Sequence, residues 1–389
     1  MKNNLRVTHY ATNFSKTSET FIYDYVTELE AQGVRVSVVT HNRYNTQSRP
    51  FEPVYIVDLP SRWHPVRLFH RIRLGNSEAS FWPQARSQLR NKIAEIDPQL
   101  IHTHFRPMAA MLHPVARSLD IPLVAHFHNG GTVSSLVPDS YWEDQYDALF
   151  DSASALIGVS THICDKLRQL GAPDEKIRLL HGGIRLSKFD YDPPGPRFDG
   201  ETVQCLHVGR LVEKKAPLDL LRAFHVARQH VGDDVDLHLT IAGDGPMRED
   251  VEALIAELEL SAQVQCLGNV PHDRVVDLMR KSHLYTQHCK TASDGDEEGQ
   301  GITFVEASAT GLPIITTRHN GIPDVVKDGE TGFLVSEGDV EDMGEKIGYL
   351  ALHPEKWPSF SETGRSRVEE HFDLTKQTRK LISIYEDIV

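Results

Sequence analysis

Two glutamates flank a glycine-rich loop in the second half of the chain. Residues 294–311 read DGDEEGQGITFVEASATG, with Glu298 in the loop and Glu306 about one turn inside the expected helix. Gly299 and Gly301 let the backbone approach a ligand closely, and the free N–H groups at a helix start bind anions. Carboxylates here either accept hydrogen bonds from sugar hydroxyls or only interact with the helix dipole. The segment predicts a site for a sugar and an anion, with helix capping as the alternative.

Two cations lie upstream, directly after an expected strand that ends at Gly209. The segment reads VGRLVEKKAP over residues 208–217, which places Arg210 and Lys215 on the loop and at the start of the next helix. Two cations there suit a diphosphate, whose charge grows if it departs as a leaving group. The alternative is a solvated basic helix start, which the helix dipole disfavours.

Paired histidines end two expected strands of the first half, His102-x-His104 and His126-x-His128. Residues two apart in a strand share one face, so such pairs can ligate zinc. A metal-dependent hydrolase is therefore an alternative enzyme class. The other interpretation is a set of hydrogen-bonded histidines without a metal, because no later His or Asp set has matching strand-end placement.

Short apolar runs alternate with helical patterns along the whole chain, which is typical of a doubly wound parallel sheet. Helices are expected at 18–32, with Ser18 as N-cap and Gly33 just past the end, at 217–230, 247–260 and 374–388. Strands are expected at 5–10, 34–40, 100–105, 122–128, 155–160 and 177–181, and then at 204–208, 237–242, 264–267, 284–287 and 312–316.

A segment rich in proline and glycine, residues 190–200, separates two such halves. We therefore predict two α/β domains, 1–190 and 200–372, and a tail, 373–389, that returns as a helix to the first domain. Ligands of doubly wound sheets bind beyond the carboxyl ends of the strands. The two domains are expected to face each other across a cleft that holds the site.

Composition narrows the class of protein. The 389 residues include 41 Lys and Arg against 55 Asp and Glu, a formal charge of −14, which argues against a dedicated nucleic-acid binder. The four cysteines form no CxxC pair, which favours buried reduced thiols in a cytoplasmic protein. We expect neither a signal peptide nor a membrane-spanning segment, since no window approaches 18 apolar residues.

Three motifs of the second half fall in the order and spacing of a known enzyme family. They are GR-x4-K (Gly209, Arg210, Lys215), E-x7-E (Glu298, Glu306) and GLPIITTRHNGIPDVVKDGETGFLV (311–335). The chain resembles a retaining glycosyltransferase of family 4, whose GT-B fold has two Rossmann-like domains. SETFI (18–22), HFH (126–128) and DGDEEG (294–299) resemble the branch that builds exopolysaccharides of the colanic-acid and amylovoran type.

The resemblance implies a role for each candidate residue. Arg210 and Lys215, next to Gly209, hold the diphosphate of a nucleotide sugar, and Glu298 binds the transferred sugar. Glu306 binds the ribose, and His128 reaches toward the sugar and phosphate. The other donor-binding residues act through the main chain, Asn269 and Val270 toward the base and Gly299, Gln300, Gly301 and Ile302 toward the sugar and distal phosphate.

The implied activity is transfer of a hexose, from a UDP-sugar as first choice or GDP-mannose as second, to a saccharide or lipid-linked saccharide. No metal or other cofactor is expected, although Asp294-Gly-Asp296 is also the metal–diphosphate motif of the other large glycosyltransferase fold. Asn13, Lys16 and Arg106 are candidate acceptor contacts. A non-catalytic sugar-nucleotide sensor is the remaining alternative.

One basic and apolar stretch reverses the acidic balance of the chain. Residues 61–76 read SRWHPVRLFHRIRLGN and hold four arginines and no acid. Such a stretch can lie on an anionic membrane surface. We predict peripheral contact with the inner face of the membrane, with a helix packed on the first domain as the alternative.

Overall fold

The computed structural model describes residues 5–16, 19–58, 82–128 and 139–389. The chain forms two compact units: the first comprises Met1–Gly183 and Leu374–Val389, and the second comprises Ile184–Asp373. This division falls before the predicted linker at residues 190–200. Residues 184–199 belong to the second unit, because the Ile184 amide donates to the Phe372 carbonyl at 2.9 Å and Phe189 is buried in that unit's core.

The first unit contains a parallel sheet in the order β3-β2-β1-β4-β5-β6-β7. The predicted runs became strands, whereas β3 was missed because only three half-exposed residues form it. The strands are β1 (Arg6–Phe14), β2 (Arg35–Arg43), β3 (Val54–Ile56), β4 (Leu100–His104), β5 (Leu123–Phe127), β6 (Ala155–Gly158) and β7 (Ile177–Leu179).

Helices cover both faces of this sheet. Alternate strand residues pack with α1 and α14 on one face and with α3 to α6 on the other. Gly33, at φ +92°, lies just past the end of α1 as predicted, while Ser18 lies outside the described residues. The helices are α1 (Thr20–Ala31), α3 (Trp82–Ile96), α4 (Arg106–Ser118), α5 (Asp139–Ser152), α6 (Thr161–Gln169) and α14 (Leu374–Glu386).

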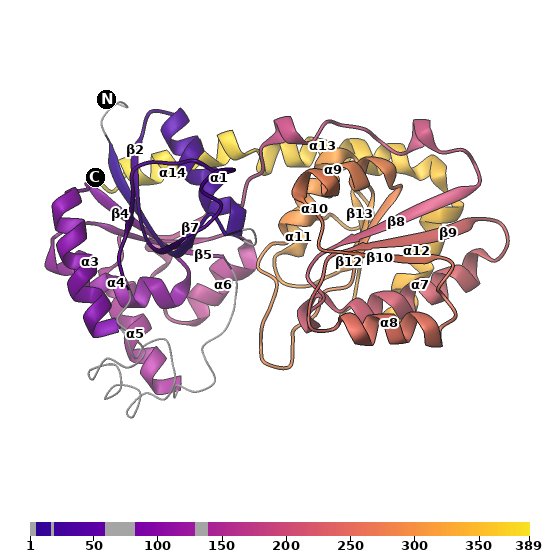
Figure 1. The fold of residues 1–389 in the computed structure, drawn as a ribbon, viewed down its shortest axis with the longest axis horizontal. Coiled ribbons are helices and arrows are strands. Elements are labelled where there is room, and N and C mark those ends of the chain that lie inside the picture. Colours follow the sequence, from indigo (N-terminus) through magenta and orange to yellow (C-terminus); the bar gives the residue numbers. More distant parts are fainter. Residues whose placement is uncertain (1–4, 17–18, 59–81, 129–138) are drawn as a thin grey trace. The chain divides into compact units, whose positions relative to one another are not determined.

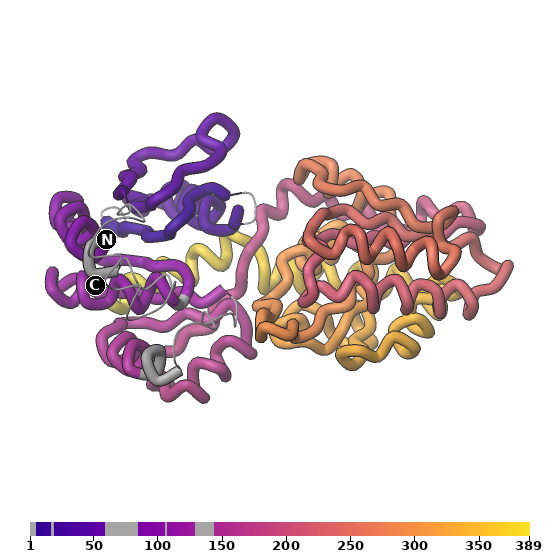
Figure 2. Tube along the Cα trace, turned by 60° about the horizontal axis from the view of Figure 1, so that its bottom comes forward, coloured from indigo at the N-terminus to yellow at the C-terminus, as the bar shows by residue number. Residues whose placement is uncertain are grey.

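The C-terminal helix α14 is part of the first unit although it is last in the chain. Leu374, Leu381 and Tyr385 are buried beside Ile22 and Tyr25 of α1. Figures 1 and 2 both show this yellow helix among the indigo and magenta elements of that unit. The helix thereby places the buried Tyr385 against the sheet, beside His9, which is 376 residues away in sequence.

The second unit has a parallel sheet in the order β10-β9-β8-β11-β12-β13. The edge strand β13 was not predicted. The strands are β8 (Thr202–Val208), β9 (Asp236–Ala242), β10 (Val264–Gly268), β11 (Leu284–Gln287), β12 (Ile314–Thr317) and β13 (Gly332–Val335).

Helices again lie on both faces: α7, α8 and α12 share one buried cluster, and α9, α10 and α11 share the other. They are α7 (Pro217–Val231), α8 (Arg248–Glu257), α9 (His272–Lys281), α10 (Ile302–Thr310), α11 (Ile322–Val325), α12 (Val340–Leu352) and α13 (Trp357–His371). Among the described residues, no helix is both long enough and apolar enough to span a bilayer.

Candidate active site

Lys215 and Glu298 meet at the carboxyl edge of the second sheet. Lys215 follows β8 and Glu298 follows β11, and these strands are neighbours in the sheet. The Lys215 Nζ atom lies 2.6 Å from Glu298 Oε2, and the two side chains are only 12 % and 17 % exposed. The exposed guanidinium of Arg210 is close enough to act electrostatically on Lys215. The structure thus brings together three residues that the sequence predicted as one site.

Both partners of this pair are held in their charged forms. Burial by itself lowers the pKa of Lys215, but the charge of Glu298, the neighbouring Cys289 and the hydrogen bond to Glu298 together outweigh burial, so the pKa is raised. For Glu298, burial raises the pKa, whereas Lys215 and then Lys214 lower it, to about 2. Glu298 therefore offers a carboxylate that accepts hydrogen bonds, and Lys215 offers a cation.

Two neighbours that the sequence did not single out fix this pair. His319, fully buried after β12, accepts a hydrogen bond from the Glu298 amide at Nε2 (3.2 Å) and contacts Glu337 Oε1 through Nδ1 (2.5 Å). Gln287, oriented to satisfy its neighbours, accepts from Lys215 Nζ at 3.1 Å. His319 lies within the quoted 311–335 motif, which was the one available signal for it.

Asp294-Gly-Asp296, the alternative metal–diphosphate motif, is engaged in protein contacts. Lys214 Nζ lies 3.0 Å from Asp296 Oδ1 and donates to the Glu297 carbonyl at 3.2 Å, and the Asp296 amide donates to Asp294 Oδ1. Neither aspartate belongs to the groups of potential metal ligands found in the described residues. Lys214 and Asp296 therefore act here as a pair that anchors the loop before Glu298.

Glycine is required at two points of the site by close approach. At Gly301, with φ +79°, an added Cβ would lie 2.4 Å from the Phe304 ring. At Gly243, after β9, an added Cβ would lie 1.8 Å from the Gly209 carbonyl. Gly301 directly precedes α10, so the free amides of that helix start at Ile302, next to the buried Gly299 and Gln300.

Glu306 forms a second polar contact, on the inner side of α10. Its Oε1 lies 3.0 Å from Nε2 of His272, whose pKa is raised mainly by this hydrogen bond. His272 begins α9, directly after the loop that holds the exposed Asn269 and the half-buried Val270. His272 was missed by the sequence analysis, because a single histidine at a helix start carries no motif.

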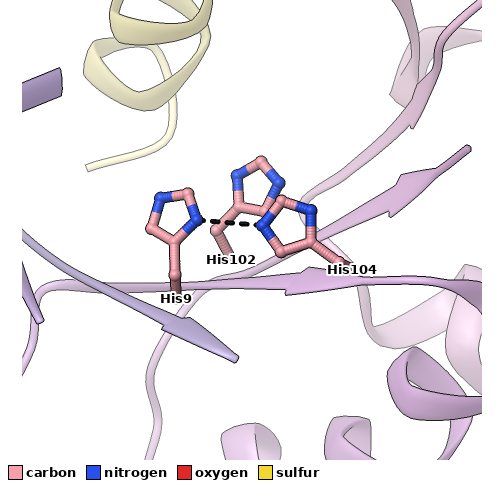
Figure 3. Close-up of side chains that lie close together, drawn as sticks. All are labelled: His9, His102 and His104. Carbon is pink, nitrogen blue, oxygen red and sulfur yellow. Dashed lines mark hydrogen bonds between the residues drawn. The ribbon is translucent and has the colours of Figure 1, made fainter. Parts of the chain in front are cut away.

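Five histidines gather on one face of the first sheet. His9 pairs in register with His102, and His104 pairs with His126, while His128 follows β5. Strand alternation places all five on the face that α1 and α14 cover. Figure 3 shows the rings of His9, His102 and His104 close together, and all three are fully buried. His9 was not predicted to belong to this group, although it lies in the strand expected at residues 5–10.

Burial keeps these imidazoles neutral. It lowers the pKa of His9 and of His128 to about 3, and it lowers those of His102, His104 and His126 as well. In the described residues, His9, His102 and His104 form one potential metal-ligand group, and His104, His126 and His128 form another. Hydrogen bonds join several of their ring nitrogens in pairs, whereas Nε2 of His126 has no hydrogen-bond partner among the described residues.

Two candidate acceptor residues, Asn13 and Lys16, lie at the end of β1, and the third, Arg106, begins α4. Asn13 accepts a hydrogen bond from Asn42, and the exposed Lys16 lies 3.8 Å from Glu19. The Arg106 side chain and the stretch 61–76 lie outside the described residues. These acceptor and membrane contacts stay predictions.

Two family models match successive parts of the chain. Residues 18–188 match the model described as Glycosyltransferase Family 4, and residues 190–367 match Glycosyl transferases group 1. The chain belongs to these glycosyltransferase families, and the prediction of a glycosyltransferase is thus confirmed.

Curated relatives cover the full length of this glycosyltransferase. WcaL of Salmonella typhimurium, named for colanic acid biosynthesis, is 24 % identical over 99 % of this chain and 100 % of WcaL. The amylovoran biosynthesis glycosyltransferase AmsK of Erwinia amylovora is 24 % identical over 98 % of this chain and 99 % of AmsK.

Solved structures show the same fold at low identity. Anabaena HepE in complex with UDP has a TM-score of 0.78 at 16 % identity, covering 98 % of this chain and 100 % of HepE. A glycosyltransferase of Rickettsia africae has a TM-score of 0.79 at 17 % identity, covering 99 % of each chain.

Proposed function

We propose that this glycosyltransferase is a retaining hexosyltransferase of exopolysaccharide assembly. The donor is a nucleotide-diphosphate sugar, a UDP-sugar as first choice and GDP-mannose as second, and the acceptor is a saccharide or lipid-linked saccharide. One observation carries the proposal: the paired Lys215 and Glu298, both charged and nearly buried, beside Arg210 and the start of α10. The full-length likeness to WcaL and AmsK supports exopolysaccharide assembly, and HepE, solved with UDP, supports a uridine donor.

This arrangement suits a sugar diphosphate because it offers a cation and an anion side by side. The ammonium of Lys215 and the guanidinium of Arg210 attract the two phosphates, together with the free amides at the start of α10. The ionised Glu298 accepts hydrogen bonds from sugar hydroxyls. Glu306 accepts from the ribose, with His272 holding its carboxylate in place.

In the proposed reaction the bond between the sugar C1 and the distal phosphate oxygen breaks. A new bond forms from C1 to the acceptor oxygen on the same face of the ring, and the departing phosphate takes the acceptor's proton. Negative charge grows on the diphosphate as the bond breaks, so Lys215 and Arg210 stabilise the transition state more than the ground state. His128 contacts the transferred sugar and phosphate in this proposal.

We further propose that turnover needs no metal and takes place at the cytoplasmic side of the membrane. Fixed cations and helix amides can supply the charge that a divalent ion supplies elsewhere. Transfer should persist in excess chelator, and strict dependence on manganese would contradict this part of the proposal. Residues 61–76 are the segment to test for membrane contact, by flotation with anionic liposomes of wild type and of the variant Arg67→Glu with Arg71→Glu.

The decisive experiment combines a donor panel with matched variants. Transfer from UDP-, GDP-, ADP- and dTDP-sugars is measured for wild type, Lys215→Ala and Glu298→Ala. Each variant should lose about 100-fold or more, the scale of one electrostatic contact to a transition state.

Exposed residues of the same unit provide the controls. Lys346→Ala and Glu252→Ala, each removing one member of a surface ion pair, should transfer at wild-type rates. Near-native rates in Lys215→Ala or Glu298→Ala would refute the assignment of the site. Stoichiometric zinc in the purified protein, together with hydrolase activity, would favour the histidine-based hydrolase instead.

A further inference from the structure

The five histidines, of which His128 is partly buried and the others are buried, are linked through one tyrosine into a single hydrogen-bonded chain. Starting from His128, each contact joins one ring nitrogen to the next group. The contacts are His128 Nε2 to His104 Nδ1 (2.9 Å), His104 Nε2 to His9 Nδ1 (3.0 Å), His9 Nε2 to Tyr385 Oη (3.3 Å), Tyr385 Oη to His102 Nδ1 (2.5 Å) and His102 Nε2 to His126 Nδ1 (3.2 Å).

Such a chain couples the tautomers of its members. A neutral imidazole carries one N–H and one lone pair, so a ring between two partners donates to one and accepts from the other. His9, His102 and His104 each have both ring nitrogens engaged. The Tyr385 hydroxyl could also accept from both His9 and His102, but its buried hydrogen would then have no acceptor among the described residues. All five histidines therefore carry hydrogen on Nδ1, or all five carry it on Nε2, with Tyr385 oriented to match.

The buried end of the chain selects between these two states. Nε2 of His126 is buried and has no hydrogen-bond partner among the described residues. If hydrogen sat on every Nε2, His126 would bury an orphaned N–H donor, which is rarer in proteins than an orphaned acceptor. With hydrogen on every Nδ1, His126 leaves only a lone pair without a partner.

We infer that the chain fixes His128 as the Nδ1–H tautomer, with Tyr385 and His104 acting as its positioning residues. Every donor in the chain then points toward His128, whose Nε2 accepts from His104. In the part of the chain that the structure describes, Nδ1 of His128 has no hydrogen-bond partner, so it is the ring nitrogen left for a ligand, and it carries a hydrogen. His128 therefore donates to a ligand oxygen and has no lone pair with which to act as a base.

This inference rests on the proposed function where it concerns substrate: the acceptor of the Nδ1–H is an oxygen of the transferred sugar or its phosphate. The inference also gives α14 a role beyond packing. Tyr385 of this helix supplies the hydroxyl that joins the two parts of the hydrogen-bonded histidine chain, since His9 and His102 both contact it. Without that hydroxyl, the segment from His9 to His128 loses the partner that sets its direction.

The tautomer is directly measurable by long-range ¹H–¹⁵N correlation spectra of protein labelled with ¹⁵N-histidine. Protonated and bare ring nitrogens have well-separated ¹⁵N shifts, so each histidine reports its own state. We expect protonated Nδ1 and bare Nε2 at His128 and His104 in the wild type. A bare Nδ1 at His128 would overturn the inference, whatever reaction the enzyme catalyses.

Tyr385→Phe tests the link to function, with Tyr25→Phe as the matched control. Both changes remove one buried hydroxyl, but Tyr25 lies on α1 and donates to the His181 carbonyl rather than to the chain. Tyr385→Phe should give mixed tautomers at His128 and a kcat about fivefold to tenfold lower, the scale of one hydrogen bond, with KM for the donor changed less than twofold. Tyr25→Phe should leave both the spectrum of His128 and kcat unchanged.

The outcomes separate this inference from the proposed function. Wild-type kinetics and tautomers in Tyr385→Phe would refute the positioning role. A wild type that transfers no sugar from any donor would refute the proposed function and leave the tautomer result standing. If Tyr385→Phe does not fold, the wild-type spectrum alone still decides the tautomer.

Discussion

Mild acid should destabilise the first unit because its buried histidines stay neutral when folded. Burial lowers the pKa of His9 and His128 to about 3, whereas an unfolded imidazole titrates near 6.5. The stability contributed by these groups is therefore complete above pH 6.5 and is lost as the pH falls from 6.5 toward 3. The groups that shift these pKa values include no carboxylate, and Tyr385, which faces the cluster from α14, has a raised pKa and stays neutral.

The magnitude follows from proton linkage. At pH 5 the unfolded chain gains about 2 kcal/mol from protonating each such histidine, so His9 and His128 together cost about 4 kcal/mol of folding free energy. His102, His104 and His126 add to the loss in the same direction. A domain has only about 5–15 kcal/mol to lose, so the effect is large.

Urea denaturation followed by hydrogen exchange measures the effect unit by unit. Peptides covering β4 and β5 should lose protection from hydrogen exchange as urea is added. The midpoint of this loss should be about 2 M lower at pH 5 than at pH 7.5, if the unfolding free energy falls by about 2 kcal/mol per M of urea. His353→Ala, which removes a half-exposed histidine of the second unit, should leave this shift unchanged. Equal midpoints at the two pH values would refute the idea that the folded unit excludes protons from the cluster.

Three further outcomes are expected. Lys215→Met should lower the unfolding free energy of the second unit by about 3 kcal/mol, because Glu298 is left charged and nearly buried. The double variant Lys215→Met with Glu298→Leu should regain this stability, measured by calorimetry, but should not regain sugar transfer. If the double variant transferred sugar at wild-type rates, the pair would be structural. His128→Ala should reduce transfer more than nucleotide affinity measured by calorimetry, and equal losses in both would indicate a structural role. Gly301→Ala should lose most donor binding, since its Cβ would lie 2.4 Å from Phe304 at φ +79°, and an unchanged dissociation constant would show that the loop adapts.

The pairing of Lys215 with Glu298 was predictable from the sequence. Each follows an apolar run that forms a buried strand, and the carboxyl ends of parallel strands meet at one edge of a sheet. The contact of His319 with the Glu298 amide was not predictable, because no local sequence pattern shows that the loop after a third strand, β12, contacts the loop that holds Glu298. The same holds for Gly243, whose close approach to Gly209 depends on how two loops pack.

The domain boundary shows the same division. We predicted a junction at the proline- and glycine-rich segment 190–200, whereas the two units divide between Gly183 and Ile184. Hydrogen bonding at Ile184 and packing at Phe189 place the residues before that segment in the second unit. The short edge strands β3 and β13 were missed for a related reason: three or four residues carry too little pattern, and pairing with a neighbour defines them.

The sequence by itself determined the two parallel sheets, the loops that carry charge and glycine, and the family, because alternation of apolar runs and motif spacing are local properties of the chain. Only the tertiary structure decided that His9 joins two HxH pairs and that Tyr385 links them. Strand register sets which side chains of neighbouring strands face one another, and packing of α14 sets where its hydroxyl lies. Both are contacts between residues far apart in sequence, which no local pattern encodes.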